Sequence, residues 1–287
     1  MKLQKAERHQ VKLRLGLSGA SGFGKTYSAL LLAYGITEDW SKIAVIDTEN
    51  NSASLYSDLG NFNVLPLNEP FSPERYIEAI EICEKSSIEV IIVDSITHEW
   101  QGAGGCLNIH EKLGGRFQDW AKVSPRHSAF INKILNADAH VITTVRRKVD
   151  YSIDTNNMGR AKVIKHGTKE ITREGFEYEL TVNFELVNDK HLVSASKDRT
   201  RLFMDKPEFV INSSTGKKLK QWCNASKSIE EIKLEINNAE NENDLATIYH
   251  KYGNYRDEIV QLLSNKKAEL NNLSKSVVEQ QEVINPK

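Results

Sequence analysis

The sequence has few cysteines and little net charge. Among 287 residues it has 3 cysteines, and its formal net charge at pH 7 is −1. The cysteines (Cys83, Cys106 and Cys223) lie far apart, with no C-x-x-C pair, which argues against a disulfide framework or a zinc site and fits a reducing compartment. A nearly neutral chain is not expected to coat nucleic acid through bulk charge, so any such contact must be local.

Long hydrophobic runs are also lacking. The N-terminal stretch MKLQKAERHQ has no apolar segment of a signal peptide, and nothing in the chain is long and apolar enough to span a membrane. We therefore expect a cytoplasmic protein that is neither secreted nor bound to a membrane. With 39% hydrophobic residues, the chain is long enough for one large domain with an appendage.

Residues 13–31 hold the most specific motif of the chain. They read LRLGLSGASGFGKTYSALL, an apolar strand, a glycine-rich turn and an apolar helix. The turn matches the phosphate-binding P-loop pattern G-x-x-x-x-G-K-[ST]. Backbone N–H groups at such a helix N-terminus point at an anion, the lysine adds positive charge for the β- and γ-phosphates, and the threonine hydroxyl is a hard ligand for Mg²⁺. The residues predicted to bind ATP here are Gly19, Ser21, Gly22, Phe23, Gly24, Lys25, Thr26 and Tyr27.

Strand-like and helix-like segments alternate through the first half of the chain. The strand-like segments are near-continuous apolar runs at 12–17, 43–47, 62–67, 90–94 and 140–145. Such runs are typical of a parallel sheet covered by helices on both faces. Helices are expected at 25–34, 52–59, 73–85 and 125–135. Late antiparallel strands are expected at 176–187 and 191–195, around a turn at Asn188 and Asp189.

The composition changes at about residue 225, where Glu, Lys, Asn and Leu predominate. Ser228 and Glu231 form a capping box that opens a helix. We expect a first domain over 1–224, a small helical appendage over 225–273 and a disordered tail over 274–287. Residues 229–244 carry six acidic side chains and one lysine. This acidic face is open to three interpretations: a solvated surface, an autoinhibitory mimic of nucleic acid, or a docking site for a protein partner.

Carboxylates follow two of the apolar strands. Asp94 ends the run VIIVD, and Asp47 and Glu49 end the run that begins at residue 43. Side chains at the carboxyl ends of parallel strands project into the crevice where such sheets bind ligands. Asp94, with Thr26, is therefore the predicted Mg²⁺ residue, and Glu49 is the candidate general base for the attacking water. The alternatives are a helix N-cap for Asp94 and a solvated loop acid for Glu49.

These motifs together resemble a known family. VIDTE at 45–49 and IVDS at 92–95, after the P-loop, are similar to the RecA-like recombinase ATPases. The similarity is greatest to phage-borne Sak-type single-strand annealing ATPases and AAA-type ATP-binding proteins, and covers roughly residues 13–203. It implies a RecA-like P-loop NTPase core, ATP and Mg²⁺ as cofactors, homo-oligomers, single-stranded DNA as a partner, and the host cytoplasm if the protein is phage-encoded.

The resemblance also implies roles for single residues. Glu49 falls on the catalytic base of the family, and Tyr56 falls on an aromatic residue that stacks on adenine, with a packing role in the protein as the alternative. Lys25 contributes to catalysis through the phosphates. Lys197 and Arg199 fall on cations that reach the nucleotide of a neighbouring subunit, in the manner of an arginine finger; an ordinary basic strand edge is the alternative. Thr144 departs from the family, since bacterial RecA has a γ-phosphate-sensing glutamine there.

Residues 146–170 are polar and lack periodicity. A structureless loop of this length inside a compact domain is usually functional. Its cations outnumber its acids, which fits contacts with the phosphates of single-stranded DNA, although a solvated loop or the lid of a kinase would have a similar composition. The predicted DNA-binding residues are Arg146, Arg147, Lys148, Arg160, Lys162 and Lys165.

The leading hypothesis is thus a Mg²⁺-dependent, DNA-stimulated ATPase of phage-type DNA recombination or repair. Two alternatives stay open: a nucleotide-gated scaffold or loader for replication proteins that binds through the appendage, and a small-molecule or nucleotide kinase. His98, Glu99 and His110 show no metal-ligand spacing, and no metal beyond Mg²⁺ is expected. Trp100 and Trp120 flank a glycine-rich stretch that is either a second DNA-facing loop or packing.

Overall fold

The computed structural model describes residues 11–155, 161–224, 229–252 and 259–271. The chain divides into two compact units. One consists of Lys12–Leu219, and the other combines Met1–Val11 with Lys220–Lys287. Each unit is described by itself. Among the described residues, none of the helices has the length and apolar character needed to cross a membrane.

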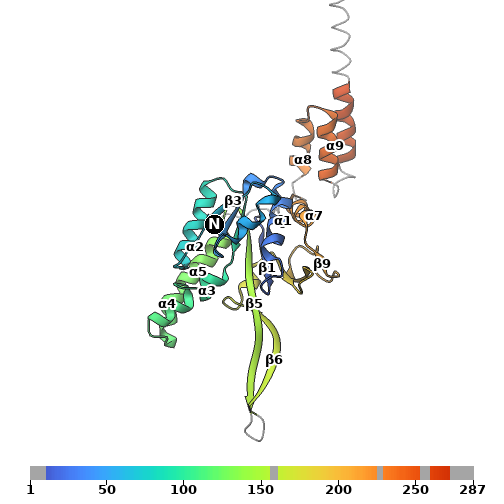
Figure 1. Ribbon diagram of the computed structural model, residues 1–287. Helices are drawn as coiled ribbons and strands as arrows, with labels where there is room; N and C mark the ends of the chain where they lie inside the picture. Colours follow the sequence, from blue (N-terminus) through green and yellow to red (C-terminus); the bar gives the residue numbers. More distant parts are fainter. Residues whose placement is uncertain (1–10, 156–160, 225–228, 253–258, 272–287) are drawn as a thin grey trace, which may run out of the picture. The chain divides into compact units, whose positions relative to one another are not determined.

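The first unit is built on one mostly parallel sheet (Figure 1). Its strand order is β3-β2-β4-β5-β1-β7-β8-β9, with β6 paired to β5. The first six strands of this order run parallel, and β8 and β9 are antiparallel additions at the edge. The strands are β1 (Arg14–Gly19), β2 (Ile43–Asp47), β3 (Asn63–Pro66), β4 (Val90–Asp94), β5 (His140–Thr155), β6 (Ala161–Glu170), β7 (Val182–Leu186), β8 (Leu192–Asp198) and β9 (Phe209–Val210).

Helices cover both faces of this sheet, as the continuous apolar strands predicted. On one face, Tyr76 and Ile80 of α2 and Phe130 and Ile134 of α5 pack against the buried side chains of β2, β4 and β5. On the other face, α1 contacts β1, β4 and β5. The helices are α1 (Lys25–Thr37), α2 (Pro73–Lys85), α3 (Thr97–Gln101), α4 (Cys106–Lys112), α5 (Trp120–Asn136), α6 (Phe176–Glu179) and α7 (Ser213–Asn224), and the 3₁₀ turns are η1 (Trp40–Lys42), η2 (Ser52–Leu59) and η3 (Phe117–Asp119).

A buried arginine joins the start of β1 to the end of α5. The Arg14 side chain is 6% exposed and donates to the carbonyl oxygens of Leu135, Ala137 and Ala139, at 2.6 to 2.9 Å for the shortest contact with each. The carbonyl of Leu135 is one that the end of α5 leaves without a partner inside the helix, and those of Ala137 and Ala139 lie in the segment that follows. Burial lowers the pKa of Arg14 to about 10.

The segment 146–170 is not the structureless loop that the sequence predicted. Strand β5 continues to Thr155, and β6 folds back along it as an antiparallel hairpin, with a shift of register between Asp150 and Tyr151. In Figure 1 this hairpin extends away from the sheet. A two-stranded ribbon beyond the sheet has no core to cover, so its side chains lack the alternation of polar and apolar residues that marks a strand.

Two further element boundaries were wrong. Residues 176–179 form helix α6 before β7 begins, instead of the first part of a strand. Helix α5 begins at Trp120, and Pro125 lies inside it. The missing N–H of Pro125 removes one hydrogen bond of the second turn, and the helix continues because Val123, Phe130 and Ile134 bury one face.

The second unit holds a small helical group with its own core. It contains α8 (Ile229–Asn237), α9 (Glu242–Lys251) and a helical stretch at 259–271. Asn241 caps α9 by accepting from the N–H of Asp244 at 2.9 Å. The core side chains are Ile232, Ile236, Leu245, Ile248, Tyr252, Ile259 and Leu263. The predicted tail at 274–287 lies outside the described residues.

Candidate nucleotide-binding site

The P-loop connects β1 to α1 at the carboxyl edge of the sheet. Gly22 and Gly24 have φ angles of 81° and 87°, a region that side chains with a Cβ disfavour. A Cβ at Gly22 would meet no atom within 4 Å, so the loop is open above this glycine. The N–H of Ser28 bonds the carbonyl of Gly24 at 2.9 Å, which begins α1. The geometry is that of an anion-binding helix N-terminus.

Lys25 lies beside the acids of the site. Its ammonium nitrogen donates to the carbonyl of Ala20, within the loop, at 2.8 Å. Burial lowers the pKa of Lys25, while the charges of Asp94 and Glu49 oppose that change. A partly desolvated cation at the start of a helix attracts phosphate oxygens more strongly than a solvated one would.

Thr26 and Asp94, the two predicted Mg²⁺ residues, are in direct contact. The Thr26 hydroxyl donates to Oδ2 of Asp94 at 2.6 Å, and Thr144 donates to Oδ1 of the same carboxylate. Asp94 is 2% exposed, and burial raises its pKa. A hydroxyl and a carboxylate at this distance are hard oxygen ligands that fit Mg²⁺. Thr144 therefore orients the carboxylate from the next strand.

Asp47 stabilises the turn after β2, and Thr48 joins this turn to the end of β4. The Asp47 carboxylate accepts from the N–H groups of Glu49 and Ala53, at 2.6 and 2.8 Å, so it caps the turn after β2. The Thr48 hydroxyl accepts from the N–H of Ser95 at 2.9 Å, and its oxygen lies 2.7 Å from Nδ1 of His98. These contacts fix the backbone on both sides of Glu49.

Glu49 is paired with the first cation of the hairpin. Nε of Arg146 donates to Oε1 of Glu49 at 3.0 Å, and a terminal nitrogen of the same guanidinium lies 2.7 Å from Oε2. Burial alone would raise the pKa of Glu49, but the hydrogen bond and the charge of Arg146 outweigh it and hold this pKa below its usual value. The candidate base and a predicted DNA contact are therefore one ion pair.

Two tyrosines stand beside the P-loop. Tyr27, in the first turn of α1, is 42% exposed, and its ring centroid lies 5.8 Å from that of Tyr56 in η2. Tyr56 is only partly buried. The pair offers an aromatic surface next to the phosphate-binding loop, where an adenine would need one.

His191 touches the P-loop and could not be found from the sequence. It lies in the turn between β7 and β8, and its Nδ1 is 2.8 Å from the carbonyl oxygen of Phe23. A Cβ at Gly24 would come within 2.7 Å of the same nitrogen. The contact depends on how the antiparallel strands are placed beside β1, which no local motif encodes.

Lys197 and Arg199 lie toward the amino ends of the parallel strands, away from the P-loop. Lys197 pairs with Asn183, and Asn183 pairs with Gly16, whereas the P-loop begins beyond Gly19. Both cations bond the carbonyl oxygen of Tyr178, Arg199 at 2.6 Å. The structure does not bring them to the P-loop of their own chain, and a role toward a neighbouring subunit stays a prediction.

The other predicted DNA-binding cations differ in their surroundings. Arg147 forms an ion pair with Glu185 at 3.2 Å and donates to the carbonyl oxygen of Thr168 at 2.6 Å. Its side chain is 16% exposed. Lys148 is exposed on β5. Lys162 and Lys165 belong to β6 by their backbone, and Arg160 lies outside the described residues.

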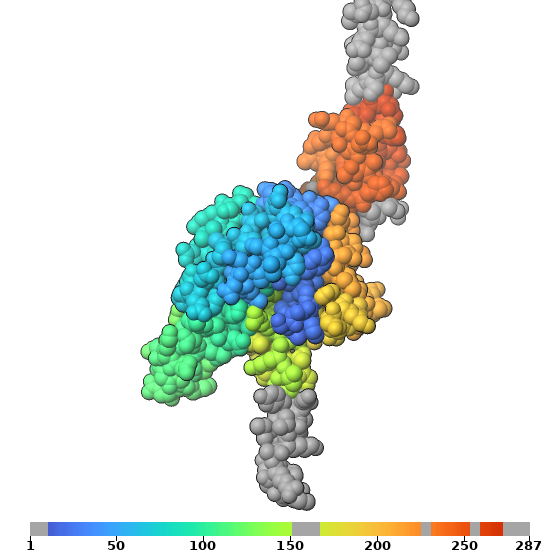
Figure 2. Space-filling view, viewed as in Figure 1, coloured from blue at the N-terminus to red at the C-terminus, as the bar shows by residue number. Residues whose placement is uncertain are grey.

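A groove runs between α3, α5 and the base of the hairpin. Its volume is about 1020 Å³. Trp100 and Trp120 stack in its wall at 5.7 Å, and Phe117 is 88% exposed at its rim. In Figure 2 the green segment around α4 and the yellow-green base of the hairpin both stand out from the first unit. We call this hollow the aromatic groove; the cations that line it are Lys148, Lys169 and Arg173.

Three comparisons with known proteins add to this geometry. A crystal structure titled as the RadB recombinase matches with 16% identity and a TM-score of 0.41, covering 70% of this chain and 88% of that one. No curated protein matches the chain. The AAA domain family, AAA_24, matches residues 11–228. That match covers the P-loop, Asp94 and the whole sheet, so the chain belongs to the AAA_24 family and is a P-loop ATPase that binds ATP, typically with Mg²⁺.

Proposed function

We propose that this ATPase acts in phage-type DNA recombination or repair, binds single-stranded DNA along the hairpin and the aromatic groove, and works as a homo-oligomer. The observation that carries the proposal is the ion pair between Glu49 and Arg146. It connects the candidate base for hydrolysis to the root of the element that carries the predicted DNA contacts. Glu49 would take the proton of the water that attacks the γ-phosphate.

The chemistry of the aromatic groove supports single-stranded DNA as its ligand. Proteins that bind single strands combine cations along the backbone with aromatic rings on which bases stack. Phe117 and the stacked tryptophans supply rings, and Lys148 is exposed on the side of the hairpin. Glu170 and Glu174 also line the groove, and Lys169 pairs with Asp150 at 3.0 Å, so the attraction is local rather than that of a uniformly basic surface.

Coupling between DNA and ATP would pass through Arg146. A DNA phosphate at the root of the hairpin competes with Glu49 for the guanidinium of Arg146, because phosphate and carboxylate can each accept two parallel hydrogen bonds from its N–H groups. Once Arg146 leaves, the pKa of Glu49 rises from its lowered value and the carboxylate becomes a stronger base. This exchange would serve in place of the γ-phosphate-sensing glutamine that is replaced by Thr144.

The oligomer and the protein partner are further parts of the proposal. Because Lys197 and Arg199 lie away from the P-loop of their own chain, an effect on hydrolysis would require a neighbouring subunit. The helices within 229–252 and 259–271 have their own core and would present their acidic side chains to a protein partner.

Single-stranded DNA binding tests the proposal directly. We expect a labelled oligonucleotide to bind, with an affinity that falls as salt rises, and ATP turnover to increase when the oligonucleotide is added. Phe117→Ala should weaken binding about tenfold, as expected for the loss of one stacked base. Leu55→Ala is the control, since Leu55 is 80% exposed but does not line the groove. Equal binding by both variants and the wild type would contradict the groove as the DNA site.

The same assay separates the alternatives. A nucleotide-gated scaffold would bind ATP and keep its low turnover with DNA present, a result consistent with Glu49 staying on Arg146. A kinase would be stimulated by a small acceptor instead of DNA.

A further inference from the structure

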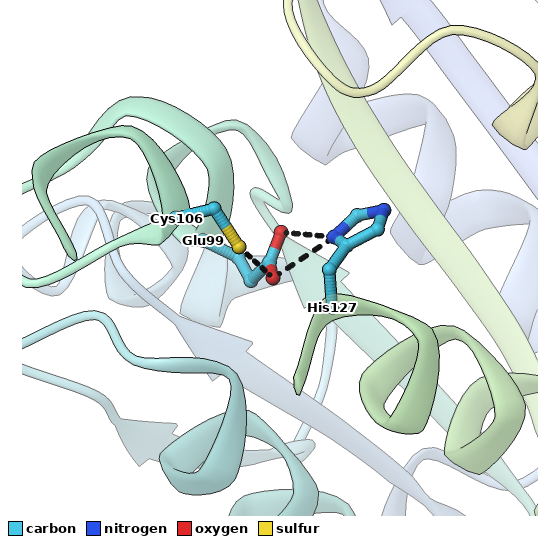
Figure 3. A group of neighbouring side chains, drawn as sticks. All are labelled: Glu99, Cys106 and His127. Carbon is cyan, nitrogen blue, oxygen red and sulfur yellow. Dashed lines mark hydrogen bonds and ion pairs between the residues drawn. The ribbon is translucent and has the colours of Figure 1, made fainter. Parts of the chain in front are cut away.

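Three side chains of metal-ligating types meet in the interior, apart from the nucleotide site. Sγ of Cys106 lies 3.0 Å from Oε1 of Glu99, and Nδ1 of His127 lies 3.0 and 3.1 Å from the two oxygens of the same carboxylate. Figure 3 shows the thiol and the imidazole approaching this carboxylate from opposite sides. The three ligand atoms lie within 4.8 Å of one another.

The group is buried and joins three separate helices. Glu99 on α3 and Cys106 on α4 are 0% exposed, and His127 on α5 is 4% exposed. A buried carboxylate needs a cation or several donors, because an isolated charge in the interior is strongly unfavourable. The convergence is therefore a feature of the fold, not of a solvated surface.

In the surrounding lobe, residues 97–122, the aromatic rings of Trp100, His110 and Trp120 stack on one another but are only partly buried. Helices α3 and α4 have 5 and 7 residues, too few to be stable without packing. The lobe's sole buried hydrophobic side chain is Cys106 itself; Leu107 is 39% and Phe117 is 88% exposed. Small units that cannot bury enough apolar surface are commonly held by a metal ion.

We propose that Glu99, Cys106 and His127 bind one Zn²⁺ ion, which fixes the lobe to α5. A thiolate, an imidazole and a carboxylate form a borderline donor set that suits zinc, and three protein ligands leave a fourth position for water. The charges of a thiolate, a carboxylate, a neutral imidazole and Zn²⁺ sum to zero. A site without net charge is favoured in the protein interior. The ligands are spread over three helices, so the spacing rules by which the sequence argued against zinc could not detect them.

A hydrogen-bonded cluster of the same residues is the competing account, and Cys106 distinguishes the two. Without metal, the imidazole bonds the carboxylate and the protonated thiol is a minor partner, because thiols are weak donors. With zinc bound, the thiolate is a ligand, and its proton is released to solvent on binding. Loss of Cys106 therefore changes the metal content of the protein only if the cluster is a metal site; in a hydrogen-bonded cluster it removes a weak donor and a small buried side chain.

Metal analysis of the full chain tests the proposal. Untagged protein, purified without chelator, should contain one zinc ion per chain when its metal content is measured by inductively coupled plasma mass spectrometry. Cys106→Ala should lose it, whereas Cys83→Ala, which removes another buried cysteine, should keep it. Cobalt exchanged into the wild type should give a thiolate-to-metal charge-transfer band that Cys106→Ala lacks.

Proteolysis gives a readout that does not depend on ATPase activity. Removing the zinc with a chelator should speed tryptic cleavage after Lys112 and Arg116, both exposed in the lobe, and adding zinc back should slow it. Zinc at background level in the wild type, with no cobalt band, would overturn the proposal and leave the hydrogen-bonded cluster. The wild-type measurements decide this even if a variant fails to fold.

Discussion

Replacing Arg146 with alanine should release the candidate base. The pair between Arg146 and Glu49 is bidentate, with contacts at 3.0 and 2.7 Å, and its side chains are 36% and 24% exposed. Hydrogen bonds to charged groups contribute about 1.5–3 kcal/mol and exposed ion pairs below about 1 kcal/mol. For this half-buried pair we take about 1–2 kcal/mol.

That energy sets the expected change in rate. If the pair must open before Glu49 can accept a proton, removing Arg146 lowers the barrier by about 1–2 kcal/mol, which corresponds to about 5- to 30-fold in turnover. Arg146→Ala should therefore hydrolyse ATP about 5- to 30-fold faster than the wild type without DNA. Added single-stranded DNA should then have little further effect, because the residue that DNA competes for is gone.

Steady-state phosphate release, with and without an oligonucleotide, measures both effects. Arg126→Ala is the matched control, because Arg126 also forms a bidentate pair, with Glu74 at 2.6 and 2.8 Å, but does not contact the site. Its basal rate and DNA stimulation should equal those of the wild type. A tenfold or larger loss of turnover in Arg146→Ala, with and without DNA, would show that Arg146 does not restrain Glu49 and would make it a direct stabiliser of the transition state.

Three further predictions concern the free energy of unfolding and the binding of adenine. Glu74→Gln should lower the free energy of unfolding by less than about 1 kcal/mol at neutral pH, because Glu74 and Arg126 are both more than a third exposed. The hydrogen bond from Arg126 lowers the pKa of Glu74 from 4.5 to about 2. Chemical denaturation should therefore show the difference between variant and wild type above pH 4.5, and the difference should disappear as pH falls toward 2. Arg14→Leu should lower that free energy by about 2–4 kcal/mol, because it leaves buried carbonyls without donors; a loss below about 1 kcal/mol would mean that water replaces the guanidinium. Tyr56→Ala should raise the Kd for ATP about tenfold by calorimetry while Tyr56→Phe stays within about twofold, as stacking of a base on an aromatic ring implies; an unchanged Kd in Tyr56→Ala would place the adenine elsewhere.

The sheet and its phosphate-binding edge could be predicted from sequence because their signals are local. The continuous apolar strands, the glycines of the P-loop and the carboxylate at the end of β4 are each recognised within a few consecutive residues. The hairpin at 146–170 could not, because a ribbon exposed on both faces has no hydrophobic period. The side chain of Arg146 was expected on DNA, and its contact with Glu49 depends on the parallel register of β2, β4 and β5, which brings distant segments to one edge.

Other contacts between distant segments could not be predicted either, because they too depend on the tertiary structure. His191 reaches Phe23 only because β7 and β8 are added beside β1. Glu99, Cys106 and His127 come from three helices, and no motif spacing links them. In each case the residues are ordinary in the sequence, and only the packing gives them a shared chemistry.

In the proposed mechanism, Glu49 activates water at a site that single-stranded DNA controls. The most direct measurement is ATP turnover of the wild type and of Glu49→Gln, each with a saturating oligonucleotide, together with the Kd for ATP. We predict that Glu49→Gln binds ATP as the wild type does and turns over at least about 100-fold more slowly, as the loss of a general base implies. Equal turnover of the two proteins would show that Glu49 is not the general base.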